Sequence, residues 1–287
     1  MSGRRADNRR GLSLFVLTRE GEPARKRMPL KESEAIVLRT FPLGEGDRLV
    51  SFLDRQSGKL RGVARGAKLP KSRFGSTLEL LSYIRIWYFE RETRELVRIN
   101  QCELIESFLD LQRDYQAGVY LALMSEITEA VLGEREAADP QFRLLLLSAR
   151  AIRTNGPTPA ILAYFCLWTV RLGGWLGSLD QCARCGRAFG QETVYASPGS
   201  SGMCCAECRE DGRGVYLEPA GARMKSISQV ALLVGRAALS GTLERMLKGN
   251  PSLPGSNEIS SFALDILEHH IERKLVARQM LVTGKSE

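Results

Sequence analysis

Residues 35–66, AIVLRTFPLGEGDRLVSFLDRQSGKLRGVARG, decide what kind of fold the N-terminal part of the chain adopts. Three β-rich runs, AIVLRT, RLVSFLD and KLRGVARG, are separated by the turn-forming stretches PLGEGD at 42–47 and QSG at 56–58. Two more β-rich runs follow, LLSYIRIWYFE and LVRINQCELIE. Five short strands in this order suit a small barrel, and the OB-fold is the commonest five-stranded one. We therefore expect an OB-fold β-barrel domain over residues 31–108, of a kind that often binds single-stranded nucleic acid.

After Leu109 the apolar residues recur at three- and four-residue spacing, which predicts helices. Asp139–Pro140 and Thr158–Pro159 are typical of helix starts. The predicted helices cover residues 111–133, 140–154, 158–176, 220–248 and 258–276. The pattern indicates an α+β multidomain protein, in which a helical domain spans residues 109–179 and 213–287. Residues 1–30 show no sustained period and are expected to form a basic, disordered tail, with Met1 or Met28 as the natural start.

The positive charge of the chain is concentrated in one stretch of the barrel. The chain has a formal net charge of +8, and between Asp54 and Glu79 it contains no acidic residue. The basic residues of this window are Arg55, Lys59, Arg61, Arg65, Lys68, Lys71 and Arg73. Such a cluster costs stability through self-repulsion unless it is solvated or something anionic lies on it. A solvated charge run is the alternative, but the absence of acidic neighbours and the OB-fold context favour DNA.

Strand alternation places Lys59, Arg61 and Arg65 on one face of the third strand. Lys68, Lys71 and Arg73 continue the row into a loop, which makes a stripe that can follow a phosphate backbone. Base stacking normally accompanies such a stripe, and Phe74 is our candidate. Trp87 and Tyr88 face opposite ways on a strand, so we expect at least one of them in the core. The pattern favours backbone contacts and predicts little sequence preference.

Four of the seven cysteines form two CxxC pairs, Cys182 with Cys185 and Cys205 with Cys208. This is the spacing of a zinc ribbon, in which two knuckles share one metal ion. We expect a structural Zn²⁺ site inserted over residues 180–212, with Gly186 supplying a tight turn and Cys204 as a bystander. The alternative is a set of unbound or redox-active thiols. His269 and His270 are expected to be ordinary surface or cap residues.

The sequence carries no signal for an enzyme or for a membrane protein. There is no HExxH, GxSxG or KxDG motif, so we expect no enzymatic activity. No apolar run approaches about 18 residues, which argues against a membrane span. The apolar stretch near the N-terminus is too short for a signal peptide. We expect a cytoplasmic, nucleoid-associated protein.

The sequence resembles the RecO family of bacterial recombination mediators. The resemblance rests on ESEAIVLRTFPLGEGDRLVSFLDRQSGKLRGVARGAKLPKSR at 32–73, the QCARCG and GMCCAEC knuckles, and the helical run between them. It implies an OB-fold followed by a helical domain that carries the zinc site. It further implies binding of single- and double-stranded DNA, ATP-independent strand annealing, and work with RecR and single-strand-binding protein to load RecA; whether RecF takes part stays open at this point.

Two further points remain open from the sequence. The acidic, apolar tail of single-strand-binding protein would need a groove among the helices and an arginine, for which Arg143, Arg150 and Arg171 are candidates. The competing class of function is an RNA-binding or transcription or translation accessory factor, since OB-folds and zinc ribbons also occur there. A ligase is a third reading, disfavoured by the missing KxDG motif.

Overall fold

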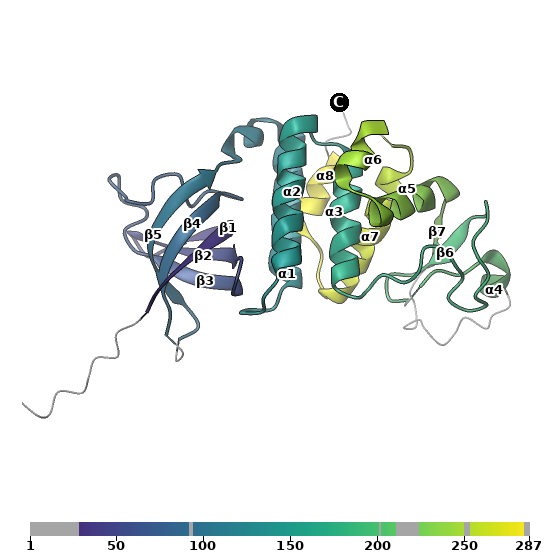
Figure 1. Ribbon diagram of the computed structural model, residues 1–287, viewed down its shortest axis with the longest axis horizontal. Helices are drawn as coiled ribbons and strands as arrows, with labels where there is room; N and C mark the ends of the chain where they lie inside the picture. The colour runs from purple at the N-terminus through teal and green to yellow at the C-terminus, as the bar shows by residue number, and fades with distance from the viewer. Residues whose placement is uncertain (1–28, 92–93, 201, 211–223, 250–252, 284–287) are drawn as a thin grey trace, which may run out of the picture.

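The computed structural model describes residues 29–91, 94–200, 202–210, 224–249 and 253–283. Most of the basic tail expected over residues 1–30 lies outside these ranges. The molecule is elongated, with a β-barrel at one end, a group of helices in the middle and a small cysteine-rich part at the other end (Figure 1). We call the described residues between 180 and 210 the cysteine module.

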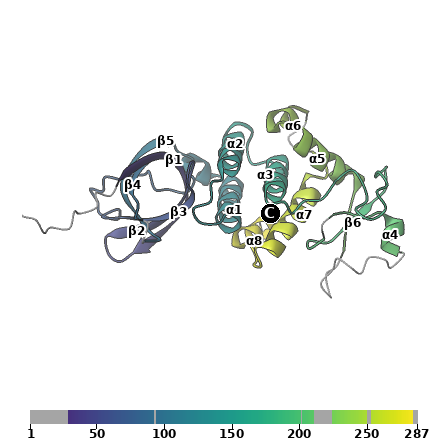
Figure 2. The same ribbon diagram turned by 60° about the horizontal axis from the view of Figure 1, so that its bottom comes forward.

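The N-terminal part is a closed barrel of five strands, as the sequence predicted. The strands pair in the order β1-β2-β3-β5-β4, and only β3 and β5 pair in parallel. Figure 2 shows the strands curving into a ring. This is the arrangement of an OB-fold. The strands are β1 (Leu30–Leu43), β2 (Asp47–Asp54), β3 (Gly58–Ala64), β4 (Tyr83–Phe89) and β5 (Val97–Glu106).

The barrel interior is built by alternation along each strand. In β3 every second residue is buried, and the residues between them, including Lys59 and Arg61, are partly exposed. The predicted two-faced character of this strand is confirmed. Tyr88 is buried in the interior while Trp87 is partly exposed, so these neighbours do lie on opposite faces.

The C-terminal part is helical and carries the cysteine module. No helix in the described ranges is both long enough and apolar enough to cross a membrane. The helices are η1 (Leu109–Arg113), α1 (Tyr115–Val131), α2 (Asp139–Asn155), α3 (Pro159–Leu172), α4 (Ala206–Glu210), α5 (Gln229–Ser240), α6 (Leu243–Gly249), α7 (Ser256–His270) and α8 (Val276–Thr283). A two-stranded sheet of β6 (Val194–Ala196) and β7 (Lys225–Ile227) joins the module to the helices.

Two of the predicted helices differ from the structure. Residues 220–223 of the single helix expected over 220–248 lie outside the described ranges. The described remainder is a strand, β7, followed by α5 and α6, because Ser228 caps α5 through its hydroxyl and Gly241 ends it. The helix expected over 258–276 ends at His270. The chain then turns through Glu272, whose φ of +55° lies in the left-handed region, before α8 begins. Apolar periodicity continues through both breaks, which is why it concealed them.

The barrel packs directly on the helices. Ile36, Leu38 and Leu53 point out of the barrel and belong to the same buried cluster as the interior residues of α1 to α3. The Ser125 hydroxyl on α1 donates to the Leu38 carbonyl at 2.7 Å. A continuous apolar contact of this kind holds two parts of a chain in a defined relation.

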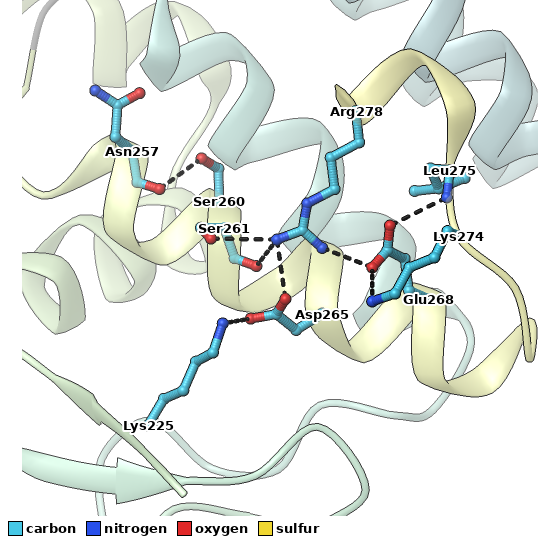
Figure 3. A network of polar contacts seen from close by, with 9 residues as sticks. All are labelled: Lys225, Asn257, Ser260, Ser261, Asp265, Glu268, Lys274, Leu275 and Arg278. Atoms are coloured by element: carbon cyan, nitrogen blue, oxygen red, sulfur yellow. Dashed lines mark hydrogen bonds and ion pairs between the residues drawn. The ribbon is translucent and has the colours of Figure 1, made fainter. Parts of the chain in front are cut away.

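A network of charges around two largely buried carboxylates fastens α8 and β7 to α7 (Figure 3). The Arg278 guanidinium on α8 contacts Asp265 at 2.9 Å and Glu268 at 3.0 Å. Lys225 on β7 pairs with the other oxygen of Asp265, and the second oxygen of Glu268 accepts from the Leu275 amide at 3.0 Å. Each buried carboxylate is therefore paired and hydrogen-bonded, as burial of a charge requires.

Candidate nucleic-acid interface and candidate metal centre

An open groove of about 830 Å³ lies at one end of the barrel, where two loops meet over β3. The β1–β2 loop forms one side, the end of β3 forms the floor, and the β4–β5 loop forms the other side. OB-folds bind oligonucleotides on this face, between these two loops. We call this feature the arginine groove. Its lining residues are Leu43, Asp47, Val63, Arg65, Phe89, Arg91, Arg94, Glu95, Leu96, Val97 and Arg98.

The arginine groove carries positive charge that the protein itself does not neutralise. Within the described residues, the exposed side chains of Arg65, Arg94 and Arg98 form no ion pair with a carboxylate. One of the two groove acids, Asp47, accepts the Gly66 amide at 2.9 Å and so holds a turn. Low-dielectric walls with one sign of charge focus a field that attracts anions. Five arginines elsewhere on the barrel do pair with acids, namely Arg39, Arg48, Arg55, Arg61 and Arg85, whereas Arg73 on the β3–β4 loop lies over the Phe74 ring.

Apolar side chains lie between the arginines. The Phe89 ring is partly exposed in the groove wall, and Leu43 and Leu96 are 40% and 38% exposed on opposite sides of it. An aromatic face beside a phosphate-binding track is the arrangement on which nucleic-acid bases stack. Phe89 is the aromatic side chain among the residues that line the groove.

Two of the sequence-predicted DNA residues face the helical part instead of the groove. The Lys59 ammonium donates to the Glu129 carbonyl of α1 at 2.8 Å, and its burial lowers its pKa. Arg61 forms an ion pair with Glu134 at 2.7 Å. Both cations already have protein partners, so the predicted stripe is interrupted at its start.

The other residues that the sequence predicted for DNA binding begin in the arginine groove and continue along the β3–β4 loop. Arg65 lines the groove, and the Lys68 ammonium donates to the Gly44 carbonyl of the β1–β2 loop at 3.1 Å. Lys71 and Arg73 are exposed farther along the chain. A base cannot stack on Phe74 in this structure, because its ring is only 1% exposed and packs inside the barrel.

The groove residues that the sequence prediction missed are Phe89, Arg91, Arg94 and Arg98. They stand in FERETRELVR at 89–98, where three glutamates are interspersed with the arginines and make the local charge look balanced. The position of this segment was the available signal. In a five-stranded OB-fold the connection between the fourth and fifth strands borders the binding face, whatever its net charge.

The four cysteines of the two CxxC pairs come together in the cysteine module. The Sγ atoms of Cys182, Cys185, Cys205 and Cys208 all lie within 4.8 Å of one another, and those of Cys185 and Cys205 are 3.9 Å apart. Four thiolates at Zn–S distances of about 2.3 Å in a tetrahedron would stand about 3.8 Å apart. The donor set and its spacing fit one metal ion.

The backbone around Cys182 favours a thiolate at this position. Burial alone would raise the pKa of the Cys182 thiol, but backbone amides at Cys185, Cys205 and Arg184 lower it to about 6. Gly186 makes the expected turn with a φ of +71°, and its amide donates to the Cys182 carbonyl at 3.0 Å.

Cys204 is not part of the cysteine cluster. Its amide donates to the Tyr195 carbonyl at 2.8 Å, and the side chain is buried. Four cysteines leave no open coordination position on a tetrahedral metal, which is the mark of a structural site. His269 and His270 lie exposed at the end of α7, as expected.

Comparison with known proteins agrees with this architecture. The family models "Recombination protein O N terminal" and "Recombination protein O C terminal" match residues 28–108 and 112–279. A DNA repair protein RecO of Koribacter versatilis is 34% identical over 257 residues, which cover 88% of this chain and 98% of the relative. One from a Nocardioides species is 34% identical, covering 86% and 96%, and one from an Anaeromyxobacter species is 28% identical, covering 86% and 93%. With an OB-like barrel, a helical part and a four-cysteine cluster in the places these matches span, the chain belongs to the RecO family of DNA repair proteins.

Proposed function

We propose that this protein is a non-enzymatic mediator of recombinational repair. It binds single- and double-stranded DNA, anneals complementary strands without ATP, and acts with RecR to help replace single-strand-binding protein with RecA in the cytoplasm. The arginine groove is the DNA site, and Zn²⁺ is the ion held by Cys182, Cys185, Cys205 and Cys208 as a structural element.

One observation carries the DNA assignment. Arg65, Arg94 and Arg98 have no carboxylate partner among the described residues and lie on the face where OB-folds bind oligonucleotides, while five arginines elsewhere on the barrel pair with acids. Leaving guanidinium groups clustered and uncompensated costs free energy through mutual repulsion, which a bound polyanion removes. The groove residues contact a backbone of phosphates from several directions, and this predicts affinity with little dependence on base sequence.

Binding should respond steeply to salt. Each phosphate contact on a single strand contributes about −0.7 to the slope of log K against log salt, so four groove arginines predict a slope of about −3. Fluorescence anisotropy with labelled single- and double-stranded oligonucleotides over a salt series measures this. Absence of binding at low salt, or a tenfold preference among sequences at fixed salt, would contradict the proposal.

The same experiment separates the DNA mediator from an RNA-binding factor. Unlabelled RNA of the same sequence should compete less well than DNA, whereas equal competition supports the accessory-factor alternative. In an annealing assay with two complementary strands and no nucleotide, the protein should accelerate duplex formation over the spontaneous rate. An unchanged rate would remove annealing from the proposal.

A second pocket, of about 650 Å³, gives a place for the tail of single-strand-binding protein. It lies along α2 and α3 and combines exposed Leu147 and Leu172 with Arg143 and Arg150. The third candidate, Arg171, lies over the ring of Trp168, which also lines the pocket. Apolar walls rimmed by guanidinium groups suit an apolar peptide with carboxylates at its end.

Of the three arginines, Arg143 is expected to matter most for this peptide. Its side chain is 67% exposed and its one carboxylate partner among the described residues is Asp139 on the same helix. Replacing it with alanine should weaken an acidic tail peptide about fivefold, since a charge-assisted contact contributes about 1 kcal/mol at a half-exposed site. Anisotropy of a labelled tail peptide measures this, with a scrambled peptide as control. An unchanged affinity would exclude Arg143 as the residue that holds the peptide.

A further inference from the structure

The segment between α1 and α2, which we call the connector (132–138), is docked on the barrel by its backbone. The Arg135 amide donates to the Lys59 carbonyl at 2.9 Å, and Lys59 and Glu134 form a parallel β-bridge. The two backbones are so close that only glycine fits at position 58, because a Cβ there would stand 1.7 Å from the Glu136 carbonyl oxygen. The connector is therefore fixed to β3 with little room to shift.

The Arg135 side chain leaves the connector and ends on the β4–β5 loop. One guanidinium nitrogen, Nη1, pairs with the Glu90 carboxylate. The other, Nη2, donates to the carbonyls of Arg94 at 3.0 Å and Glu95 at 3.2 Å. A residue of the helical part thus joins the start of this loop to its end, although the partners are 40 to 45 residues away in the chain.

The backbone of Arg135 is adapted to this contact. Its φ of +63° lies in the left-handed region, which is costly for a residue with a side chain. Such conformations persist where the surrounding contacts hold them, and here the contacts are one backbone hydrogen bond and the planar fork of the guanidinium. A lysine has a single ammonium and cannot span Glu90 and two carbonyls in the same way.

We propose that Arg135 is a positioning residue for nucleic-acid binding: it holds the β4–β5 loop so that Arg91, Arg94 and Arg98 form one wall of the arginine groove. This inference rests on the proposed DNA-binding function. The groove then depends on the helical part of the molecule, because this wall is anchored by a residue of the connector as well as by the barrel.

Replacing Arg135 with alanine should weaken single-stranded DNA binding about tenfold near 0.1 M salt and reduce the salt slope by about 1, as one or two loop contacts are lost. Lysine at this position should restore little of the affinity. Amide hydrogen exchange of the β4–β5 loop should accelerate in both variants. Arg245→Ala, which removes an exposed cation from α6, is the matched control and should bind as the wild type does.

The decisive variant is Glu90→Ala, which removes the partner of Arg135 on the β4–β5 loop. Glu90→Ala removes a negative charge near the groove, so charge alone predicts tighter DNA binding. Loss of the anchor predicts weaker binding, by about threefold to tenfold, with the same acceleration of loop exchange. Affinity equal to or above that of the wild type would overturn the positioning role.

Comparing DNA binding by the wild type and by Arg135→Ala shows whether the positioning role alone is wrong or the proposed DNA-binding function is wrong as well. If the wild type binds DNA and Arg135→Ala binds with the same affinity and slope, Arg135 has no positioning role and the function stands. If the wild type itself does not bind DNA, both fall. Thermal unfolding of each variant is measured alongside, and weaker binding by a variant that keeps the wild-type melting temperature supports the inference.

Discussion

Reversing Arg65, Arg94 and Arg98 to glutamate is expected to weaken single-stranded DNA binding at least about a hundredfold near 0.1 M salt. Three phosphate contacts disappear, which should reduce the salt slope by about 2, and three carboxylates then repel the backbone. The three side chains are exposed and have no carboxylate partner among the described residues, so the fold should not depend on them. Anisotropy over a salt series measures both the affinity and the slope.

The control must change the charge of the molecule by the same amount. Arg113, Arg245 and Lys248 are exposed on the helical part, and their reversal to glutamate lowers the net charge equally. A general electrostatic attraction predicts equal losses in the two triple variants, whereas a local groove predicts a small loss in the control. If the groove variant binds as tightly as the control does, the DNA site lies elsewhere on the molecule.

Much of the barrel was predictable because strand signals are local. Each of the five strands is a β-rich run, and turn residues bound most of them. The closed barrel could be predicted as well, because five short strands form few kinds of sheet. The four-cysteine cluster was equally predictable, since two CxxC pairs specify their own geometry. The breaks at Gly241 and Glu272 were missed because apolar residues continue at helical spacing through both.

The arginine groove was only partly predictable, because a strand pattern does not say what an exposed face will contact. Alternation correctly placed Lys59 and Arg61 on the outer face of β3, but an outer face can meet solvent, DNA or another part of the same chain. Here it meets α1 and the connector. At the β4–β5 loop the charge count led to the opposite error. The glutamates between the arginines made the local net charge small, so the sequence prediction overlooked the groove arginines.

These contacts change what a charge-reversal experiment on the stripe would report. Glutamate at Lys59 or Arg61 would stand against Glu129 or Glu134, so the variant would lose contacts between barrel and helices as well as positive charge. Placing a carboxylate beside another carboxylate in this way disfavours the contact between barrel and helices. Lost DNA binding in that variant would not locate the site, whereas the groove triple variant avoids this.

Replacing Cys182 and Cys205 together by serine is expected to abolish metal binding and unfold the cysteine module. Both side chains are buried in the module, where Phe189, Val194 and Met203 are among the few large apolar side chains that are buried with them. Structural zinc contributes about 10–16 kcal/mol to the folding of isolated zinc-finger peptides, so its loss should outweigh the burial of these few side chains. Metal analysis should fall from one ion per chain to none, with fast proteolysis between residues 180 and 210.

Cys204→Ser provides the matched control, because Cys204 is buried beside the ligands but lies outside the four-cysteine cluster. It should keep its metal and resist the protease, and loss of metal in this variant would contradict the ligand assignment. The barrel stands at the opposite end of the molecule from the module (Figure 1). DNA affinity of the metal-free double variant should therefore stay within about twofold of the wild type, since salt-dependent contacts to phosphates act within a Debye length of the groove. A large loss would mean that the module itself contacts DNA, and the groove would then be only part of the binding surface.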